Sequence, residues 1–132
     1  MSVNADEIVA ELERVFAEVP RPGIPKNYVP SGKLGNPGWD EFTYHSALVL
    51  AEQLPGHVKR AFDSPQQELP RLLWHLSDSE RLGVFSKAQL EMLLGALDLL
   101  EAEHAPVVRK LKEGARLKAV RERLERLARE RA

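Results

Sequence analysis

Apolar residues recur at helical spacing along most of the chain. Asn4 is placed to cap a first helix, and apolar residues at helical spacing then mark one face: Ile8, Leu12, Val15, Phe16 and Val19. Such spacing is typical of an amphipathic helix with one buried side. Similar runs, bounded by capping residues, prolines and glycines, predict further helices. We expect five, at residues 4–19, 40–54, 65–77, 86–104 and 106–131.

The helix at 86–104 has the clearest signals. Ser86 is a natural N-cap with Gln89 in the third position of a capping box, and Phe85 and Leu90 are spaced as a hydrophobic staple. Apart from Leu94, which falls on the polar side, the apolar residues of this helix cover about 200° of its circumference at 100° per residue. We therefore expect it to be the central helix of a bundle, covered on two sides.

Two apolar stripes occupy the C-terminal region and meet near Gly114. The first comprises Val107, Val108, Leu111 and Ala115, and the second comprises Leu117, Val120, Leu124 and Leu127. On a straight helix the two stripes would lie about 180° apart, so both cannot face one core. Either the helix breaks at Gly114 and folds back, or it continues and the second stripe meets another chain. The spacing of the second stripe is that of a coiled-coil seam, and we hypothesise that these four residues form an interface for self-association.

Residues 20–38 contain five of the nine prolines and four of the eight glycines, which predicts a loop. A loop of this length in a small domain is either functional or without fixed structure. Aromatic and basic residues in and beside it form a weaker candidate ligand site: Tyr28, Lys33, Trp39 and Tyr44.

The chain of 132 residues has no Cys, 43% hydrophobic and 30% charged residues, which fits one folded domain without disulfides. Its start is acidic and polar, so we expect no secretory signal and a cytoplasmic location. The longest apolar run, at 47–51, is far shorter than the ~20 residues that span a membrane. We expect no membrane contact.

The net charge of −1 conceals an uneven distribution. Residues 1–104 hold 9 Lys and Arg against 16 Asp and Glu, a net −7, whereas residues 105–132 hold 10 against 4, a net +6. We describe the chain as an acidic helical body followed by a basic C-terminal helix. The basic helix predicts either contact with nucleic acid or attraction to an acidic surface. Interleaved glutamates and the lack of an aromatic stacking platform weigh against nucleic acid.

Sequence motifs give little support for catalysis, a metal or a cofactor. The segment around Lys33 lacks the glycine and the hydroxyl residue of a phosphate loop. The pairs Glu41/His45 and Glu101/His104 lie one helical turn apart, but no further pair of inward carboxylates accompanies them as a di-metal bundle requires. We expect no bound metal and no cofactor, and an enzyme is the less favoured class.

Two short motifs carry a family resemblance. The chain has Ile8, Phe16 and Val19-Pro20-x-Pro22-Gly23, and later Phe85-Ser86-x-x-Gln89 before an apolar helix. In these it resembles a family of short bacterial proteins of uncharacterised function, whose N-terminal helix ends in Val-Pro-x-Pro-Gly. The resemblance covers residues 8–104 at most and implies a mainly helical fold, with no catalytic residues to carry over.

The sequence thus predicts an all-α, single-domain bundle of about five helices with a Pro/Gly-rich loop and a basic C-terminal helix, broken or continuous at Gly114. Our first functional hypothesis is an interaction protein that self-associates through this helix. The alternatives are a nucleic-acid-binding accessory protein and a small-ligand or enzymatic site at loop 20–38.

Overall fold

A computed structural model describes residues 4–19, 41–77 and 79–130, and this part of the chain contains helices and no strand. The helices are α1 (Ala5–Val15), α2 (Glu41–Asp63), α3 (Pro65–His75), α4 (Ser79–Leu82), α5 (Lys87–Glu103), α6 (Ala105–Lys110) and α7 (Gly114–Glu130). The all-α bundle predicted from the sequence is confirmed. No helix in the described ranges combines the length and apolar character needed to cross a membrane.

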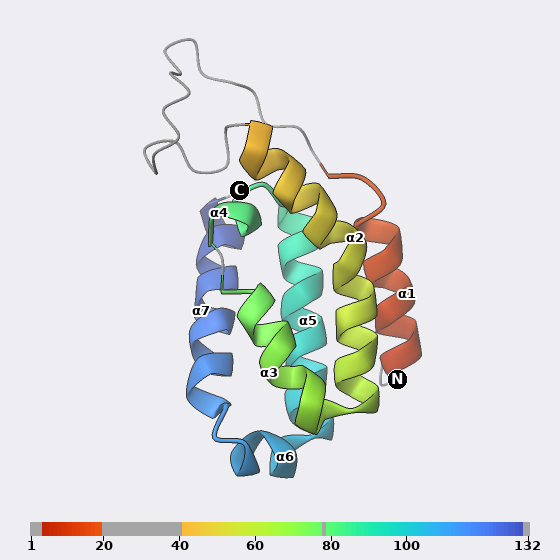
Figure 1. The fold of residues 1–132 in the computed structure, drawn as a ribbon, viewed down its shortest axis with the longest axis vertical. Coiled ribbons are helices and arrows are strands. Elements are labelled where there is room, and N and C mark those ends of the chain that lie inside the picture. Colours follow the sequence, from red (N-terminus) through yellow and green to blue (C-terminus); the bar gives the residue numbers. More distant parts are fainter. Residues whose placement is uncertain (1–3, 20–40, 78, 131–132) are drawn as a thin grey trace.

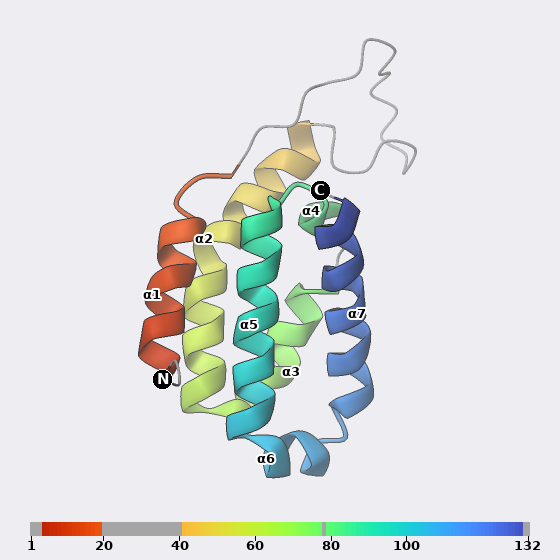
Figure 2. The same ribbon diagram turned by 180° about the vertical axis from the view of Figure 1, so that it is seen from behind.

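The helices form two layers. Helices α1, α5 and α7 stand side by side in one layer, and α2 and α3 lie behind them (Figure 2). Helix α5 packs against α1 on one side and α7 on the other, as its wide apolar arc predicted. The core is mainly aliphatic, with Phe16, Phe62 and Phe85 among its buried residues, and it includes the fully buried Leu12, Leu54, Leu72, Leu93 and Leu97.

Helix α1 begins as expected but is shorter. The Asn4 side chain accepts a hydrogen bond from the Glu7 backbone N–H at 2.8 Å. Helical structure ends at Val15 instead of residue 19, although Phe16 and Val19 remain buried. The apolar spacing was therefore right about burial and wrong about the length of the helix.

Helix α2 continues to Asp63, so the predicted end at residue 54 is wrong. Pro55 lies inside the helix, where it removes one backbone hydrogen bond. The turns after it carry buried Val58, Ala61 and Phe62 on the core side. Packing of these residues offsets the local cost of the proline. The short helix α4 also had no counterpart among the predicted helices.

The predicted helix at 106–131 is two helices joined by a reversal. Helix α6 ends at Lys110, and Lys112 has a φ of 58°, in the left-handed region. The Lys112 N–H donates to Arg109 O at 3.1 Å and the Glu113 N–H to Val108 O at 3.2 Å. These two bonds make a Schellman motif, in which a left-handed residue ends a helix. The break therefore falls at Lys112, and Gly114 begins the next helix.

The reversal brings α7 back along α5, which it contacts more extensively than any other helix (Figure 1). Of the two alternatives left open by the sequence, the structure adopts the one in which the last segment folds back on its own chain.

Candidate functional site

The apolar stripe of α7 lies in the chain's own core. The exposed fractions of Leu117, Val120 and Leu124 are 1%, 2% and 0%, and Leu127 is half-buried against the same core. These residues were expected to form an exposed seam, and this assignment is corrected because α5 and its neighbours already cover them. The stripe therefore gives no reason to invoke a second chain.

Basic residues of α7 are held by partners within the chain. Arg121 lies 2.7 Å from an Asp98 carboxylate oxygen and 3.1 Å from one of Glu101, both on α5. Arg123 donates to the backbone oxygen of Ser77 after α3. The attraction of the basic segment to an acidic surface, which the charge distribution predicted, is thus satisfied in part by the chain's own body.

Little of the candidate ligand site near the loop can be placed. Tyr28, Lys33 and Trp39 lie outside the described residues. Tyr44 is half-buried on α2, and its hydroxyl donates to Val19 O at 3.2 Å. Tyr44 therefore anchors the chain that follows α1. In the described ranges no group of three or more His, Cys, Asp or Glu side chains is arranged to hold a metal ion.

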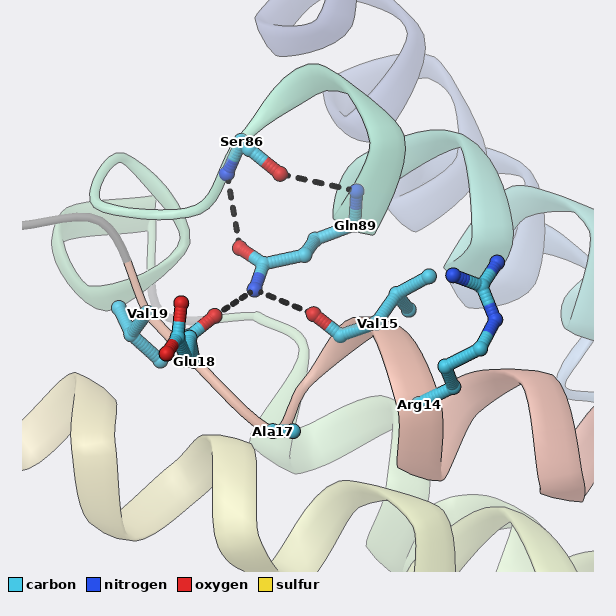
Figure 3. Close-up of a pocket in the computed structure, with 7 residues that line it drawn as sticks. All are labelled: Arg14, Val15, Ala17, Glu18, Val19, Ser86 and Gln89. Carbon is cyan, nitrogen blue, oxygen red and sulfur yellow. Dashed lines mark hydrogen bonds between the residues drawn. The ribbon is translucent and has the colours of Figure 1, made fainter.

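A hollow of about 490 Å³ lies where the end of α1 meets the start of α5 (Figure 3). Its polar lining residues are Arg14, Glu18, Ser86 and Gln89, of which Gln89 is 2% exposed. Gln89 Nε2 donates to Val15 O at 2.8 Å and to Glu18 O at 2.7 Å, and Gln89 Oε1 accepts from Ser86 N–H at 2.8 Å. Both hydrogen-bond donors and the acceptor oxygen of this amide are thus bonded to backbone groups of the chain. This hollow is a structural junction between α1 and α5.

A second hollow, of about 480 Å³, is an open groove between α1 and α5, the α1/α5 groove. Aliphatic side chains make most of its surface, with a carboxylate on each side. The α1 wall consists of Ile8 and Glu11, and α5 supplies Met92, Gly95, Asp98, Leu99 and Ala102. The stretch of α5 from Met92 to Ala102 is about 15 Å long at 1.5 Å per residue, or about three helical turns.

Gly95 lies in the middle of the groove and of helix α5. A glycine inside a helix costs about 1 kcal/mol relative to alanine. A Cβ added at Gly95 would meet only Ile8 Cδ1, at 3.7 Å, an ordinary van der Waals distance. Packing within the chain therefore does not require glycine here. Because glycine has no side chain, the groove is deepest at Gly95, and the backbone of another helix can approach α5 closely there.

The groove lies between two acidic helices. Helix α1 carries four carboxylates and one arginine, and α5 carries four carboxylates and one lysine. Arg14 donates to Glu11 at 2.7 Å, and this hydrogen bond is the main cause that lowers the pKa of the Glu11 carboxyl. Both rim carboxylates remain accessible, with 47% of the Glu11 side chain and 55% of that of Asp98 exposed.

Sequence reasoning missed this groove as a site. Met92 and Leu99 were counted in the wide apolar arc of the central helix, and the structure leaves both half-buried at the open side of that helix. The available signal was the glycine at 95, which lies between them in a strongly helical segment without ending it. A glycine inside a helix costs stability relative to alanine and leaves room beside the backbone, so it indicates a position to inspect when no turn or cap needs it.

Comparison with protein-family models, with curated proteins and with solved structures finds no match to this chain. The family resemblance in the two short motifs therefore stays a prediction.

Proposed function

We propose that this chain is a protein-interaction module that binds a basic amphipathic helix of a partner protein in the α1/α5 groove. The observation that carries the proposal is Gly95, whose position keeps an apolar groove open at its centre although a methyl group would fit.

The shape of the groove favours a helical occupant. An amphipathic helix binds a groove through apolar residues at spacings of three and four, and about three turns fit the length between Met92 and Ala102. Helix axes approach more closely where the residues at the contact are small, as Gly95 and Ala102 are. Met92 is unbranched and flexible, so its side chain can adjust to the shape of the partner.

The charge of the surrounding surface favours a basic partner. Helices α1 and α5 together carry a net charge of −6, and counting the nearby Arg121 leaves −5. Lysine and arginine beside the apolar stripe of a partner helix would face these carboxylates. Such complementarity speeds association and discriminates against acidic partners. A second copy of this chain that docks through the same face would bring the same acidic surface to the groove, so a symmetric dimer through this groove is disfavoured.

The test uses a fluorescent peptide of about 18 residues, long enough to extend beyond the groove as a helix. It carries Leu and Ala on one face and Lys and Arg on its flanks. We expect saturable binding in fluorescence anisotropy that weakens as salt screens the charges. A peptide with the same apolar face and Glu in place of the cations is expected not to bind. Equal binding of both peptides would contradict the charge argument, and binding of neither would contradict the proposal.

A pair of matched variants places the peptide. Ala102→Lys adds a cation at the exposed end of the groove, and Ala119→Lys makes the same change at an exposed alanine of α7. We expect Ala102→Lys to weaken binding about tenfold, or about 1.4 kcal/mol, and Ala119→Lys to leave it unchanged. Equal effects of the two variants would place the peptide elsewhere.

Gly95→Ala separates binding from stability. The added methyl group should stabilise helix α5 by about 0.5–1 kcal/mol, because alanine is the better helix former. The same methyl group raises the floor of the groove and should weaken peptide binding. A variant that is more stable and binds as tightly as the wild type would show that Gly95 has no role in recognition.

A further inference from the structure

Two histidines from different helices are stacked where α3 packs on α2. The ring centroids of His57 on α2 and His75 on α3 lie 4.3 Å apart, with 31° between the ring planes. His57 is 9% exposed and His75 is half-buried. The exposed Trp74 meets the His75 ring edge-on at 5.1 Å. The contact between the two rings is therefore partly shielded from water. It joins helix α2 to helix α3.

The hydrogen bond of His57 fixes its protonation state. Arg60 Nη2 lies 3.0 Å from His57 Nδ1. A guanidinium only donates hydrogen bonds, so Nδ1 must be the acceptor and the imidazole must be neutral, with its proton on Nε2. Protonation of Nδ1 would turn this hydrogen bond into a contact between two cations.

The other charged groups around His57 also favour the neutral ring. Burial is the largest cause that lowers the pKa of His57, and His75 and Arg60 lower it further. Arg71 on α3 acts in the same direction, and Glu68 on α3 raises the pKa in opposition. Glu68 is shared, since Arg60 and Arg71 both approach it, at 4.0 and 3.9 Å.

His75 is in a similar position. Burial again is the first cause that lowers its pKa, followed by the positive charges of Arg81 on α4 and Arg71 on α3. His75 Nδ1 is buried and has no hydrogen-bond partner in the described ranges. Neither ring can therefore gain a proton without placing a cation beside its stacked neighbour and the arginines.

We propose that the stacked His57 and His75 rings form an acid-sensitive contact that holds α3 on α2 while both are neutral and releases it when either is protonated. Helix α3 contacts α2 more extensively than it contacts any other helix, so losing the ring contact destabilises α3 more than it destabilises the α1, α5 and α7 layer. The buried leucines of α3 still hold it on the core, and the expected effect is therefore more frequent local opening of α3. This inference does not depend on the function proposed for the groove.

The direction of the pH effect follows from linkage. A histidine whose pKa is lower in the folded state binds more protons when the chain is unfolded. The contact therefore holds fully above the ordinary histidine pKa of about 6.5 and weakens as the pH falls below it, through the folded-state pKa.

Amide hydrogen exchange of the full chain tests the proposal between about pH 7.5 and pH 5, after correction for the intrinsic pH dependence of exchange. We expect protection of the α3 amides to fall about tenfold or more at the lower pH, while α5 amides keep theirs. Equal loss in α3 and α5 would mean global acid unfolding and would overturn the proposal. Unchanged protection in α3 would also overturn it.

A non-titrating double variant supplies the control. His57→Asn keeps an oxygen near the Nδ1 position to accept from Arg60, and His75→Phe keeps a ring for stacking. The pH effect on α3 should disappear in this variant and persist in His45→Asn, which changes an exposed histidine of α2. If the double variant does not fold, an NMR pH titration of the His57 and His75 ring resonances in the wild type tests the proposal instead. Folded-state pKa values at or above about 6.5 for both rings would contradict it.

Discussion

Gln89 on α5 donates a hydrogen bond to the backbone oxygen of Val15 at the end of α1, 74 positions earlier in the chain, with an Nε2 to O distance of 2.8 Å. The same nitrogen donates to Glu18 O, and the side-chain oxygen caps its own helix at Ser86. One buried amide thus forms hydrogen bonds with the C-terminal end of α1 and with the N-terminal end of α5 (Figure 3).

Gln89→Ala is expected to destabilise the fold strongly. It leaves two backbone oxygens and one N–H without their partner, and the expected loss is about 2–4 kcal/mol in the free energy of unfolding. Urea unfolding followed by circular dichroism measures it. Ser86→Ala removes only the cap and should cost about 1 kcal/mol.

Gln89→Glu is the matched variant that removes the two hydrogen bonds donated by Gln89 Nε2 and keeps the acceptor oxygen. A carboxylate at this position still accepts from Ser86 N–H but cannot donate to Val15 O or Glu18 O. Its loss of stability should lie between those of Ser86→Ala and Gln89→Ala, or exceed both if repulsion from the two oxygens dominates. A loss no greater than that of Ser86→Ala would show that the bonds to α1 contribute nothing.

Gln89 also shows which contacts could be predicted from the sequence and which could not. Ser86 and Gln89 form the capping box that their spacing predicted, since that motif is local. The bonds from Gln89 to α1 depend on how two distant helices meet, which no local pattern encodes. The helical periodicity correctly gave the buried face of α1 but not its end at Val15, where the backbone oxygen accepts from Gln89 of a distant helix.

Lys112→Gly is expected to stabilise the chain. Lys112 holds a positive φ of 58°, which costs a residue with a Cβ about 1 kcal/mol more than glycine. The gain should appear as a higher midpoint in urea unfolding. Lys112→Val should lower that midpoint, because β-branched residues tolerate this conformation least. Equal stability of the three proteins would contradict the left-handed reversal between α6 and α7.

The double variant Val120→Glu, Leu124→Glu tests the placement of the α7 stripe. Had these residues formed an exposed seam, the variant would be a folded monomer. Because they are 2% and 0% exposed within one chain, two unpaired carboxyl groups would be buried, at a cost of several kcal/mol each, which together is comparable to the usual stability of about 5–15 kcal/mol. We expect loss of the helical circular dichroism signal. A well-folded variant with a lower mass than the wild type in light scattering would contradict the burial of this stripe and support it as an interface between chains.

The sequence narrowed the C-terminal region to two arrangements but could not choose between them. The stripes on either side of Gly114 showed that a straight helix could not bury both. The reversal is made by Lys112, a residue whose type gives no signal for a left-handed conformation, and its backbone bonds are visible only in the structure. The groove was missed for a related reason, since it depends on which part of the wide apolar arc of α5 its neighbours leave open.

The most direct test of the proposed function follows the methyl groups inside the groove. The chain has two isoleucines and two methionines, so Ile8 and Met92 give nearly unique methyl signals in a labelled sample. Titration with the basic amphipathic peptide should shift the Ile8 δ1 and Met92 ε methyl resonances to saturation, with the same apparent Kd as fluorescence anisotropy. A peptide that saturates the protein while both methyl resonances stay in place would contradict binding in the α1/α5 groove.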